Sequence, residues 1–252
     1  SPMESAKDEL SNKLSLIASM FKAKYVLDNN YPGWNYDEGS KLRKQYVDFV
    51  KETEGITLKE EGTHSGLETG IFKGALQELE KRFIAFDVET TGLNPKEERI
   101  IELGAVLFEN GQAVQKFNTL VNAEVEVSEF ISNLTHITNE MLENQPREEK
   151  AYKMFQEFMK EALQGEVLVC AHNAQFDMSF LKKTFDRLQL TGKICYVDTL
   201  QLSRKYIHGP YNYKQGTIAH YLHIKNENAH RAYDDAYVCG QILNHIVKGS
   251  FQ

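Results

Sequence analysis

The sequence is poor in cysteine, in proline and in long apolar runs. Its 252 residues include three cysteines and five prolines. The cysteines, Cys170, Cys195 and Cys239, are odd in number and lack CxxC spacing, which argues against a disulfide framework and a zinc ribbon. No apolar run approaches the roughly 18 residues that span a bilayer, and no basic-then-apolar leader pattern is present. We therefore expect a cytoplasmic protein with no membrane contact.

The chain also lacks a surplus of positive charge. It has 29 Lys and Arg residues against 36 Asp and Glu residues, a formal net charge of −7. This balance argues against a protein that holds nucleic acid by bulk positive charge, but it leaves room for an enzyme with a local site. The length suits one large domain or two smaller ones.

The sequence pattern changes near residue 82. Before it, amphipathic helical segments at 5–22 and 40–53 and strand candidates at 25–27 and 55–58 predict a small α/β module. A helical connector is expected at 73–82. From Arg82 onward, strands and helices alternate. Strands are expected at 83–88, 100–108, 113–121, 167–171 and 196–198, and helices at 148–163, 177–189, 199–206 and 229–247. We predict an N-terminal module over residues 1–81 and a mixed α/β sheet with flanking helices over residues 82–252.

The first chemical signal is a pair of carboxylates, Asp87 and Glu89, in the segment FDVETTGL at residues 86–93. They stand two apart at the end of a strand, so both side chains are expected on the same face. Two like charges side by side are costly unless a cation neutralises them, and carboxylate oxygens suit Mg²⁺ or Mn²⁺. A solvated strand end followed by a turn explains this segment alone about equally well.

Two further segments carry a histidine and an aspartate. In HNAQFD, residues 172–177, Asp177 is expected at the start of a helix, where a carboxylate also stabilises the helix terminus. In HRAYDDA, residues 230–236, His230 is expected in a loop and Asp235 in the first turns of the next helix, with Asp234 as the competing carboxylate. Each segment alone has an ordinary structural explanation.

Taken together and in this order, the three segments resemble the three motifs of the DnaQ-like, DEDDh family of 3′→5′ exonucleases, which includes bacterial proofreading subunits. The resemblance covers about residues 82–248 and extends to LTHIT at 134–138 and VDTL at 197–200. It implies a ribonuclease H-like mixed sheet flanked by helices. It also implies hydrolysis of phosphodiester bonds at the 3′ ends of DNA with two Mg²⁺ or Mn²⁺ ions. The expected substrate is single-stranded DNA.

The resemblance also implies a role for each matching residue. Asp87 would bridge both metal ions, Glu89 and Asp235 would complete one metal site, and Asp177 would help to hold the other ion. His230 would be the general base, and the His-x4-Asp spacing of the family selects Asp235 over Asp234. The residues expected to contact substrate are Thr90, Thr91, Leu93, His172, Asn173 and Phe176. For Asn173 and Phe176, a helix cap and a core aromatic are equally good explanations.

The N-terminal part has a second resemblance. The segments YPGW at 31–34 and HSGLETG at 64–70 are similar to stretches of the PepD-type aminoacyl-histidine dipeptidases, over about residues 5–72. The segments that bear the metal ligands of that family are missing, and His64 and Glu68 alone cannot build a dinuclear zinc site. We therefore expect no peptidase activity, and a role of the module in dimerisation, substrate guidance or domain spacing.

Two other functions stay open at this point. One is an RNA-directed 3′→5′ exonuclease of the same fold, and the other is a non-catalytic protein that binds nucleic-acid ends. The presence of all five motif residues argues against the second. Proofreading, repair and trimming of DNA for integration all fit the sequence, and a polymerase or another nucleic-acid-processing protein would be a separate partner. The acidic balance predicts a weak, salt-sensitive and distributive grip on nucleic acid.

Overall fold

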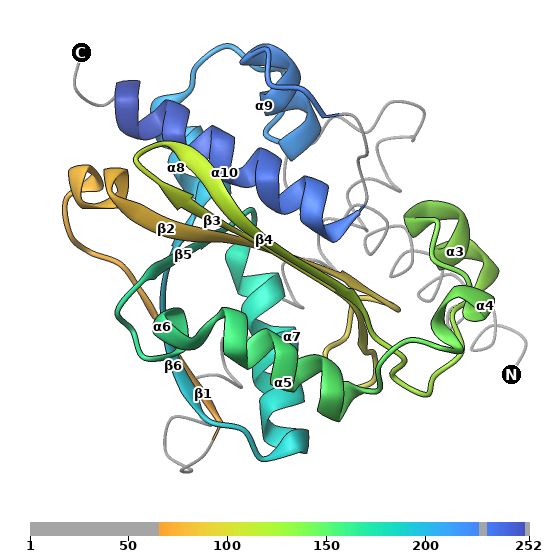
Figure 1. Cartoon of the computed structure of the whole chain (residues 1–252). Coiled ribbons are helices and arrows are strands. Elements are labelled where there is room, and N and C mark those ends of the chain that lie inside the picture. Colours follow the sequence, from red (N-terminus) through yellow and green to blue (C-terminus); the bar gives the residue numbers. More distant parts are fainter. Residues whose placement is uncertain (1–65, 227–230, 250–252) are drawn as a thin grey trace, which may run out of the picture.

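Apolar and β-branched segments of the chain form one six-stranded sheet in the computed structural model, which describes residues 66–226 and 231–249 (Figure 1). The strands are β1 (Leu67–Ile71), β2 (Arg82–Thr90), β3 (Ile100–Glu109), β4 (Gln112–Leu120), β5 (Leu168–Ala171) and β6 (Gly192–Asp198). Their order across the sheet is β1-β6-β5-β2-β3-β4. β2, β3 and β4 are antiparallel neighbours, whereas β2, β5, β6 and β1 run parallel. The predicted mixed α/β sheet is confirmed.

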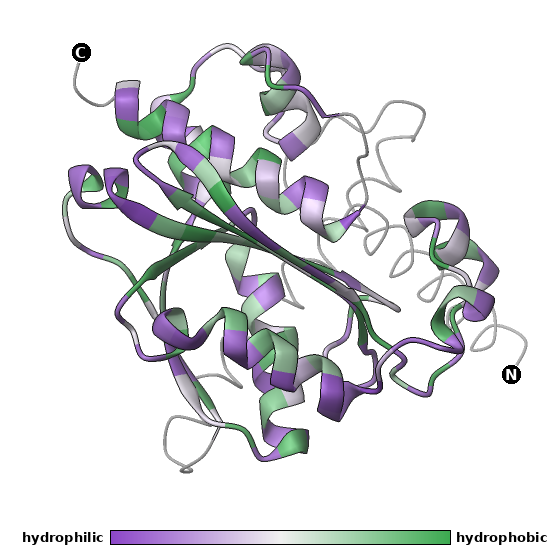
Figure 2. Cartoon of the chain, in the orientation of Figure 1, coloured by the Kyte–Doolittle hydropathy of each residue, from purple (hydrophilic) through white to green (hydrophobic). Residues whose placement is uncertain are grey.

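Helices cover both faces of this sheet. They are η2 (Leu76–Glu80), α3 (Glu129–Thr135), α4 (Asn139–Leu142), α5 (Glu148–Phe158), α6 (Lys160–Leu163), α7 (Ala174–Leu188), α8 (Thr199–Tyr206), α9 (Gln215–Tyr221) and α10 (Ala232–Gly249). α10 crosses one face together with α8, and α5, α6 and α7 lie on the other face (Figure 1). The hydrophobic residues lie along the strands and the inward sides of these helices (Figure 2).

Alternation along β2 decides which side chains meet which helix. Phe86 packs in the cluster that contains Phe155 of α5, with ring centroids 5.6 Å apart. Phe83 and Ala85 belong instead to the cluster that contains Cys239 of α10. Because side chains alternate with a period of two, the residues that continue the series 83, 85, 87 and 89 face α10.

Several element boundaries differ from the sequence-based expectation. The helix expected at 148–163 is interrupted at Met159, a fully buried residue that ends α5 and precedes α6. The strand expected at 196–198 is longer and begins at Gly192, because it pairs with both β5 and β1. The short helices α3, α4 and α9 were not expected.

The described residues before the boundary expected at residue 81 pair and pack with the sheet. β1 lies beside β6, with Leu67 opposite Gly192 and Ile71 opposite Tyr196. The predicted helical connector forms the 3₁₀ helix η2, and its Leu79 is fully buried in the same cluster as Phe83. Residues 67–80 thus belong to the sheet and its cover. The remainder of the predicted N-terminal module, including its PepD-like segments up to Ser65 and its predicted homodimer contact, lies outside the described residues and stays a prediction.

All three cysteines are free, as the sequence indicates. Cys170 of β5 and Cys239 of α10 are buried with their Sγ atoms 3.9 Å apart, and burial raises the pKa of the Cys170 thiol. Cys195 is partly exposed. Within the described ranges, no helix is long and apolar enough to cross a membrane.

Candidate active site

Two carboxylates stand at the end of β2 on the face that α10 covers. Asp87 and Glu89 are only 2% and 3% exposed. In the antiparallel pair with β3, Asp87 lies opposite Gly104 and Glu89 lies opposite Glu102. The pairing is irregular directly after Glu89, where the strand leaves the regular ladder. The prediction that both carboxylates share one face is confirmed by this register.

A third carboxylate comes from the first turn of α10. The helix begins at Ala232, and Asp235 donates its backbone N–H to the carbonyl of Arg231 at 3.0 Å. Gln215, at the start of α9, donates from Nε2 to the carbonyl of Asp235 at 2.9 Å. Carboxylate oxygens of Asp87, Glu89 and Asp235 lie within 4.8 Å of one another, and we call these three residues the carboxylate group.

The fourth predicted carboxylate reaches β2 from its other edge. Asp177 lies in the first turn of α7 and is fully buried. The last paired residue of β2 on the β5 side is Ala85, so the backbone N–H of Val88 lies beyond that ladder. This N–H donates to Oδ1 of Asp177 at 3.3 Å. Asp177 therefore sits against the main chain between Asp87 and Glu89, although it is not part of the carboxylate group.

The carboxylate group has the chemistry of a site for a hard divalent cation. Two buried carboxylates and a half-buried one at this separation repel one another in a region with little water. Oxygen ligands of this kind are the ones that Mg²⁺ and Mn²⁺ prefer. The residues present therefore fit a divalent metal ion. Asp234, the competing carboxylate, is not part of the group.

The turn after β2 holds three of the residues predicted to contact substrate. Thr90 is buried, and its Oγ1 donates to the carbonyl of Gly92 at 2.7 Å. The hydroxyl of Thr91 donates to the carboxylate of Glu98 and accepts the backbone N–H of Arg99 at 3.0 Å. The side chain of Leu93 is 9% exposed. These bonds fix the shape of the turn, and contacts of Thr90, Thr91 and Leu93 with a nucleotide stay predictions.

The segment that follows β5 holds the other three predicted substrate residues. Nε2 of His172 lies 2.8 Å from the carbonyl of Tyr213, so it carries the proton, and Nδ1 faces the hydroxyl of Thr199 at 2.8 Å. Asn173 has a left-handed backbone, with φ 62°, and donates its N–H to Oδ1 of Asp198 at 2.9 Å. The imidazole of His172 thus joins β5 to α8 and to the loop before α9.

Phe176 is 3% exposed and packs on Phe180, with ring centroids 5.0 Å apart. This placement matches the core-aromatic explanation. Asn173 occupies the residue before α7, but its side chain makes no capping hydrogen bond. Contacts of His172, Asn173 and Phe176 with substrate stay predictions. His230 lies outside the described residues, and its role as general base stays a prediction as well.

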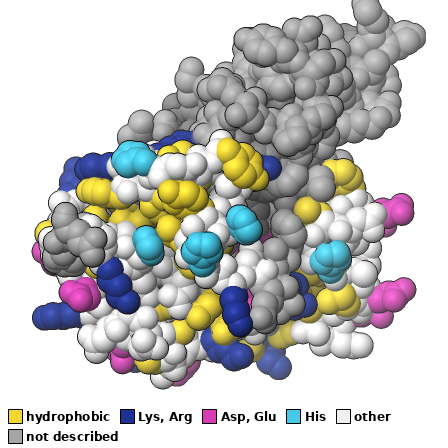
Figure 3. Space-filling model, turned by 90° about the horizontal axis from the view of Figure 1, so that it is seen from above, with side chains coloured by type: hydrophobic (Ala, Val, Ile, Leu, Met, Phe, Trp, Pro, Cys, Tyr) yellow, Lys and Arg dark blue, Asp and Glu magenta, His cyan; other side chains and the backbone are white. Residues whose placement is uncertain are grey.

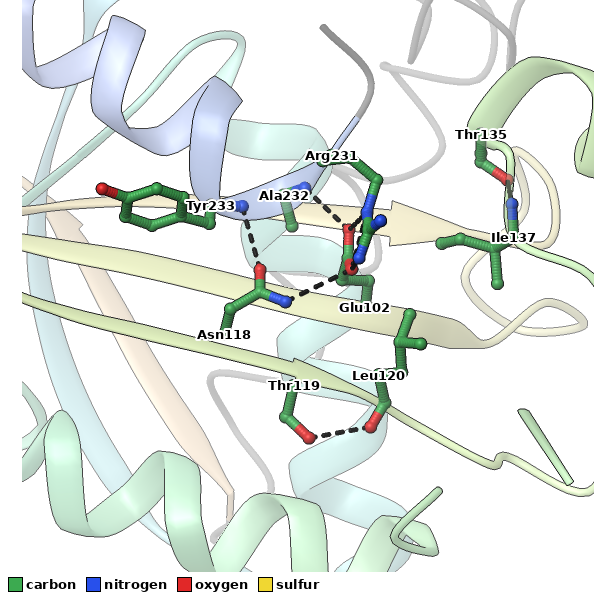
Figure 4. Close-up of polar contacts among 9 residues, drawn as sticks. All are labelled: Glu102, Asn118, Thr119, Leu120, Thr135, Ile137, Arg231, Ala232 and Tyr233. Atoms are coloured by element: carbon green, nitrogen blue, oxygen red, sulfur yellow. Dashed lines mark hydrogen bonds and ion pairs between the residues drawn. The ribbon is translucent and has the colours of Figure 1, made fainter. Parts of the chain in front are cut away.

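A polar cluster that was not predicted from the sequence lies beside the carboxylate group (Figure 4). Glu102 of β3 is fully buried, and its Oε1 accepts the backbone N–H of Ala232 at 2.7 Å. Its Oε2 accepts from Nη2 of Arg231 at 2.9 Å and from Nδ2 of Asn118 at 3.3 Å. Oδ1 of Asn118, on β4, accepts the backbone N–H of Tyr233 at 3.0 Å. The one sequence signal for this cluster is a glutamate inside the apolar run 100–108.

Comparison with known proteins agrees with this geometry. Residues 84–243 match the family model RNase_T, which is described as exonuclease. The chain belongs to the DnaQ-like, DEDDh family of 3′→5′ exonucleases. The family resemblance noted in the sequence is confirmed for this domain. Family members are metal-dependent, and an acidic cluster, the carboxylate group, is present in this chain.

Two curated proteins similar to this chain are DNA polymerase III proteins. The PolC-type DNA polymerase III of Caldanaerobacter subterraneus is 42% identical over 165 residues, which are 66% of this chain and 11% of that protein. The DNA polymerase III subunit epsilon of Treponema pallidum is 36% identical over 170 residues, which are 66% of this chain and 76% of that protein. The chain thus spans only about a tenth of the length of the PolC-type relative.

A solved structure supports the fold of this exonuclease. The nuclease domain of 3′hExo, a DEDDh family member bound to rAMP, superimposes with a TM-score of 0.58 at 18% sequence identity. The match covers 67% of this chain and 92% of that domain. The ribonuclease H-like arrangement of sheet and helices expected from the resemblance is confirmed.

Proposed function

We propose that this chain is a 3′→5′ exonuclease that removes nucleotides from the 3′ ends of single-stranded DNA with two Mg²⁺ or Mn²⁺ ions. The observation that carries the proposal is the carboxylate group, in which β2 and α10 bring three carboxylates to within 4.8 Å. The position of Asp177 beside Val88 supports it, because a fourth carboxylate lies next to the same stretch of β2.

In this proposal the carboxylates hold the metal ions and the protein fixes their positions. Asp87 would contact both ions, Glu89 and Asp235 one of them, and Asp177 the other. Such a pair of ions, when bound, stabilises charge on the attacking and leaving oxygens of the phosphodiester. β2 and the first turns of two helices supply the ligands, so rigid elements rather than loops carry them.

His230 is proposed as the general base that takes a proton from the attacking water. Histidine is the side-chain type whose ordinary pKa lies nearest to neutral pH, which suits a general base. The support is its place in the sequence, five residues before Asp235, as the family pattern requires. Thr90, Thr91, Leu93, His172, Asn173 and Phe176 are proposed to surround the terminal nucleotide.

DNA is favoured over RNA by the names of the relatives, since both curated proteins reported above are DNA polymerase III proteins. RNA stays the second candidate, because the similar 3′hExo domain binds rAMP. On the face over α9 and α10, hydrophobic and histidine side chains spread over the middle, and Lys and Arg are scattered rather than gathered in one track (Figure 3). This distribution and the net charge of −7 support a weak grip on nucleic acid, with a polymerase or another nucleic-acid-processing protein as the partner that retains the strand.

The test follows the shortening of a 5′-labelled single-stranded DNA and of an RNA of the same sequence, with and without Mg²⁺. The expected result is Mg²⁺-dependent stepwise shortening from the 3′ end, faster on DNA. Asp87→Asn and Asp177→Asn should abolish it in folded protein, whereas the matched control Asp234→Asn should keep it. His230→Ala should lower the rate by about 10²- to 10⁴-fold.

Three outcomes would contradict the proposal. They are release of the label from the 5′ end, full activity of Asp87→Asn or Asp177→Asn, and no Mg²⁺-dependent shortening by the folded wild-type protein. Faster shortening of RNA than of DNA would select the second candidate instead.

A further inference from the structure

The first turn of α10 rests in a cradle formed by β3 and β4. We define the cradle as Glu102, Gly104 and Asn118. Glu102 and Asn118 accept the first two backbone N–H groups of the helix, those of Ala232 and Tyr233, at 2.7 and 3.0 Å. Side chains of two neighbouring strands therefore satisfy two N-terminal donors of the helix, groups that have no partner within the helix itself.

Close approach of the helix depends on Gly104. A Cβ atom at this position would lie 2.3 to 2.5 Å from backbone atoms of Ala232 and Tyr233. Real Cβ atoms do not approach backbone atoms this closely. Only glycine at this position therefore allows the observed short separation between α10 and β3. Asn118 lies directly opposite Gly104 in the β3–β4 register, which places all three cradle residues on the face that α10 covers.

Both carboxylate oxygens of Glu102 accept hydrogen bonds. Its Oε1 contacts the N–H of Ala232, and its Oε2 lies 2.9 Å from Nη2 and 3.2 Å from Nε of Arg231. The hydrogen bonds from Arg231 to Glu102 raise the pKa of the Arg231 guanidinium above its ordinary value. A buried carboxylate held by two donors of one guanidinium and by a helix N-terminus has a fixed orientation.

The cradle is in register with the carboxylate group. Glu102 lies opposite Glu89, and Gly104 lies opposite Asp87. Asp235 follows Ala232 by three residues, which is less than one turn of helix. A displacement of the first turn would therefore be passed directly to the carboxylate of Asp235, while Asp87 and Glu89 would stay with the sheet.

We infer that Glu102 is a positioning residue for the metal centre, because it fixes the first turn of α10 and thereby holds Asp235 against Asp87 and Glu89. The inference rests on the proposed function, since it assigns Asp235 to metal binding. A helix cap that served stability alone would lower the resistance to unfolding without changing the affinity for metal. The two roles therefore differ in a measurable quantity.

The test compares Glu102→Gln with the wild-type protein and with Glu148→Gln. The glutamine keeps an oxygen that can accept the N–H of Ala232 but removes the charge that orients Arg231. Glu148→Gln makes the same chemical change in another ion pair, Glu148 to Arg187, which joins α5 to the last turn of α7. Calorimetric titration with Mn²⁺ in the absence of nucleic acid measures metal affinity without turnover, and thermal unfolding measures stability.

Glu102→Gln is expected to weaken Mn²⁺ binding by about 10- to 100-fold, the range typical of residues that orient metal ligands. The Mg²⁺ concentration for half-maximal activity should rise by a similar factor, and Glu148→Gln should leave both unchanged. Wild-type Mn²⁺ affinity in folded Glu102→Gln would overturn the inference, whatever its unfolding temperature.

A milder variant keeps the test decisive if Glu102→Gln does not fold. Asn118→Ala removes only the acceptor for Tyr233 and one donor to Glu102, and it should weaken Mn²⁺ binding in the same direction but less. Unchanged affinity in this variant would overturn the inference in that case. A folded wild-type protein that binds no Mn²⁺ would instead overturn the proposed function, and the positioning role with it.

Discussion

Replacement of Gly104 by alanine tests how tightly α10 must sit on the sheet. The new Cβ would lie 2.3 Å from the carbonyl carbon of Ala232 and 2.4 Å from the nitrogen of Tyr233. These are backbone atoms that cannot rotate away, and ordinary contacts begin near 3.4 Å. The first turn of α10, with Asp235, must therefore move outward by about 1 Å, and a misplacement of that size costs on the order of 10²-fold in rate.

The same change also crowds the interior, and overpacking of this kind costs about 1 to 3 kcal/mol in the free energy of unfolding. The assay measures the Mg²⁺-dependent rate of shortening of 5′-labelled single-stranded DNA, at a temperature where urea titration shows the variant to be folded. Gly70→Ala is the matched control, because it adds the same methyl group to β1 of the same sheet, where no atom lies within 4 Å. A folded Gly104→Ala protein as active as Gly70→Ala would refute the reasoning.

Two further predictions test the core. Phe155→Ala should lower the free energy of unfolding by about 3 to 5 kcal/mol in urea titration, because the ring is fully buried against Phe86 and Tyr152; a loss below 1 kcal/mol would contradict this packing. In the native protein an aromatic disulfide reagent should label Cys195 first, since burial encloses Cys170 and Cys239 and raises the pKa of the Cys170 thiol, so that little reactive thiolate forms there. Labelling of all three thiols at one rate before unfolding would show that the interface between β5 and α10 is open.

The elements that carry the chemistry were predictable from local pattern. Asp87 and Glu89 share a face because they stand two apart in a strand, and that rule needs no tertiary information. The sequence also indicated that Asp235 lies in the first turns of the last helix, which the structure confirms. The family pattern selected Asp235 over Asp234, and the carboxylate group contains the same residue.

What the sequence could not show depends on contacts between distant segments. Leu67–Ile71 is a short strand without a distinctive pattern, and only its parallel pairing with β6 makes it part of the sheet. Glu102 accepts a backbone N–H that lies 130 positions away in the sequence, and a backbone donor leaves no trace in a side-chain pattern. The place of Asp177 against Val88 likewise follows from strand order, because β5 ends before it reaches that part of β2.

The residues predicted to contact substrate also make contacts within the protein that their sequence pattern does not reveal. Thr90 and Thr91 make hydrogen bonds within their own turn, and both ring nitrogens of His172 meet interior groups. Small polar side chains beside a sharp turn commonly satisfy local backbone groups, and sequence alone does not distinguish that use from contact with a ligand.

The central claim is that Asp87, Glu89 and Asp235 form a metal centre for phosphodiester hydrolysis, and anomalous diffraction from crystals soaked in Mn²⁺ with a mononucleotide tests it most directly. We expect an anomalous peak at the carboxylate group, with carboxylate oxygens of all three residues at coordination distances of about 2.0 to 2.6 Å. The same crystals of Asp87→Asn should lose that peak. Absence of the peak in wild-type crystals that bind the nucleotide, or a peak that persists unchanged in Asp87→Asn, would contradict the claim.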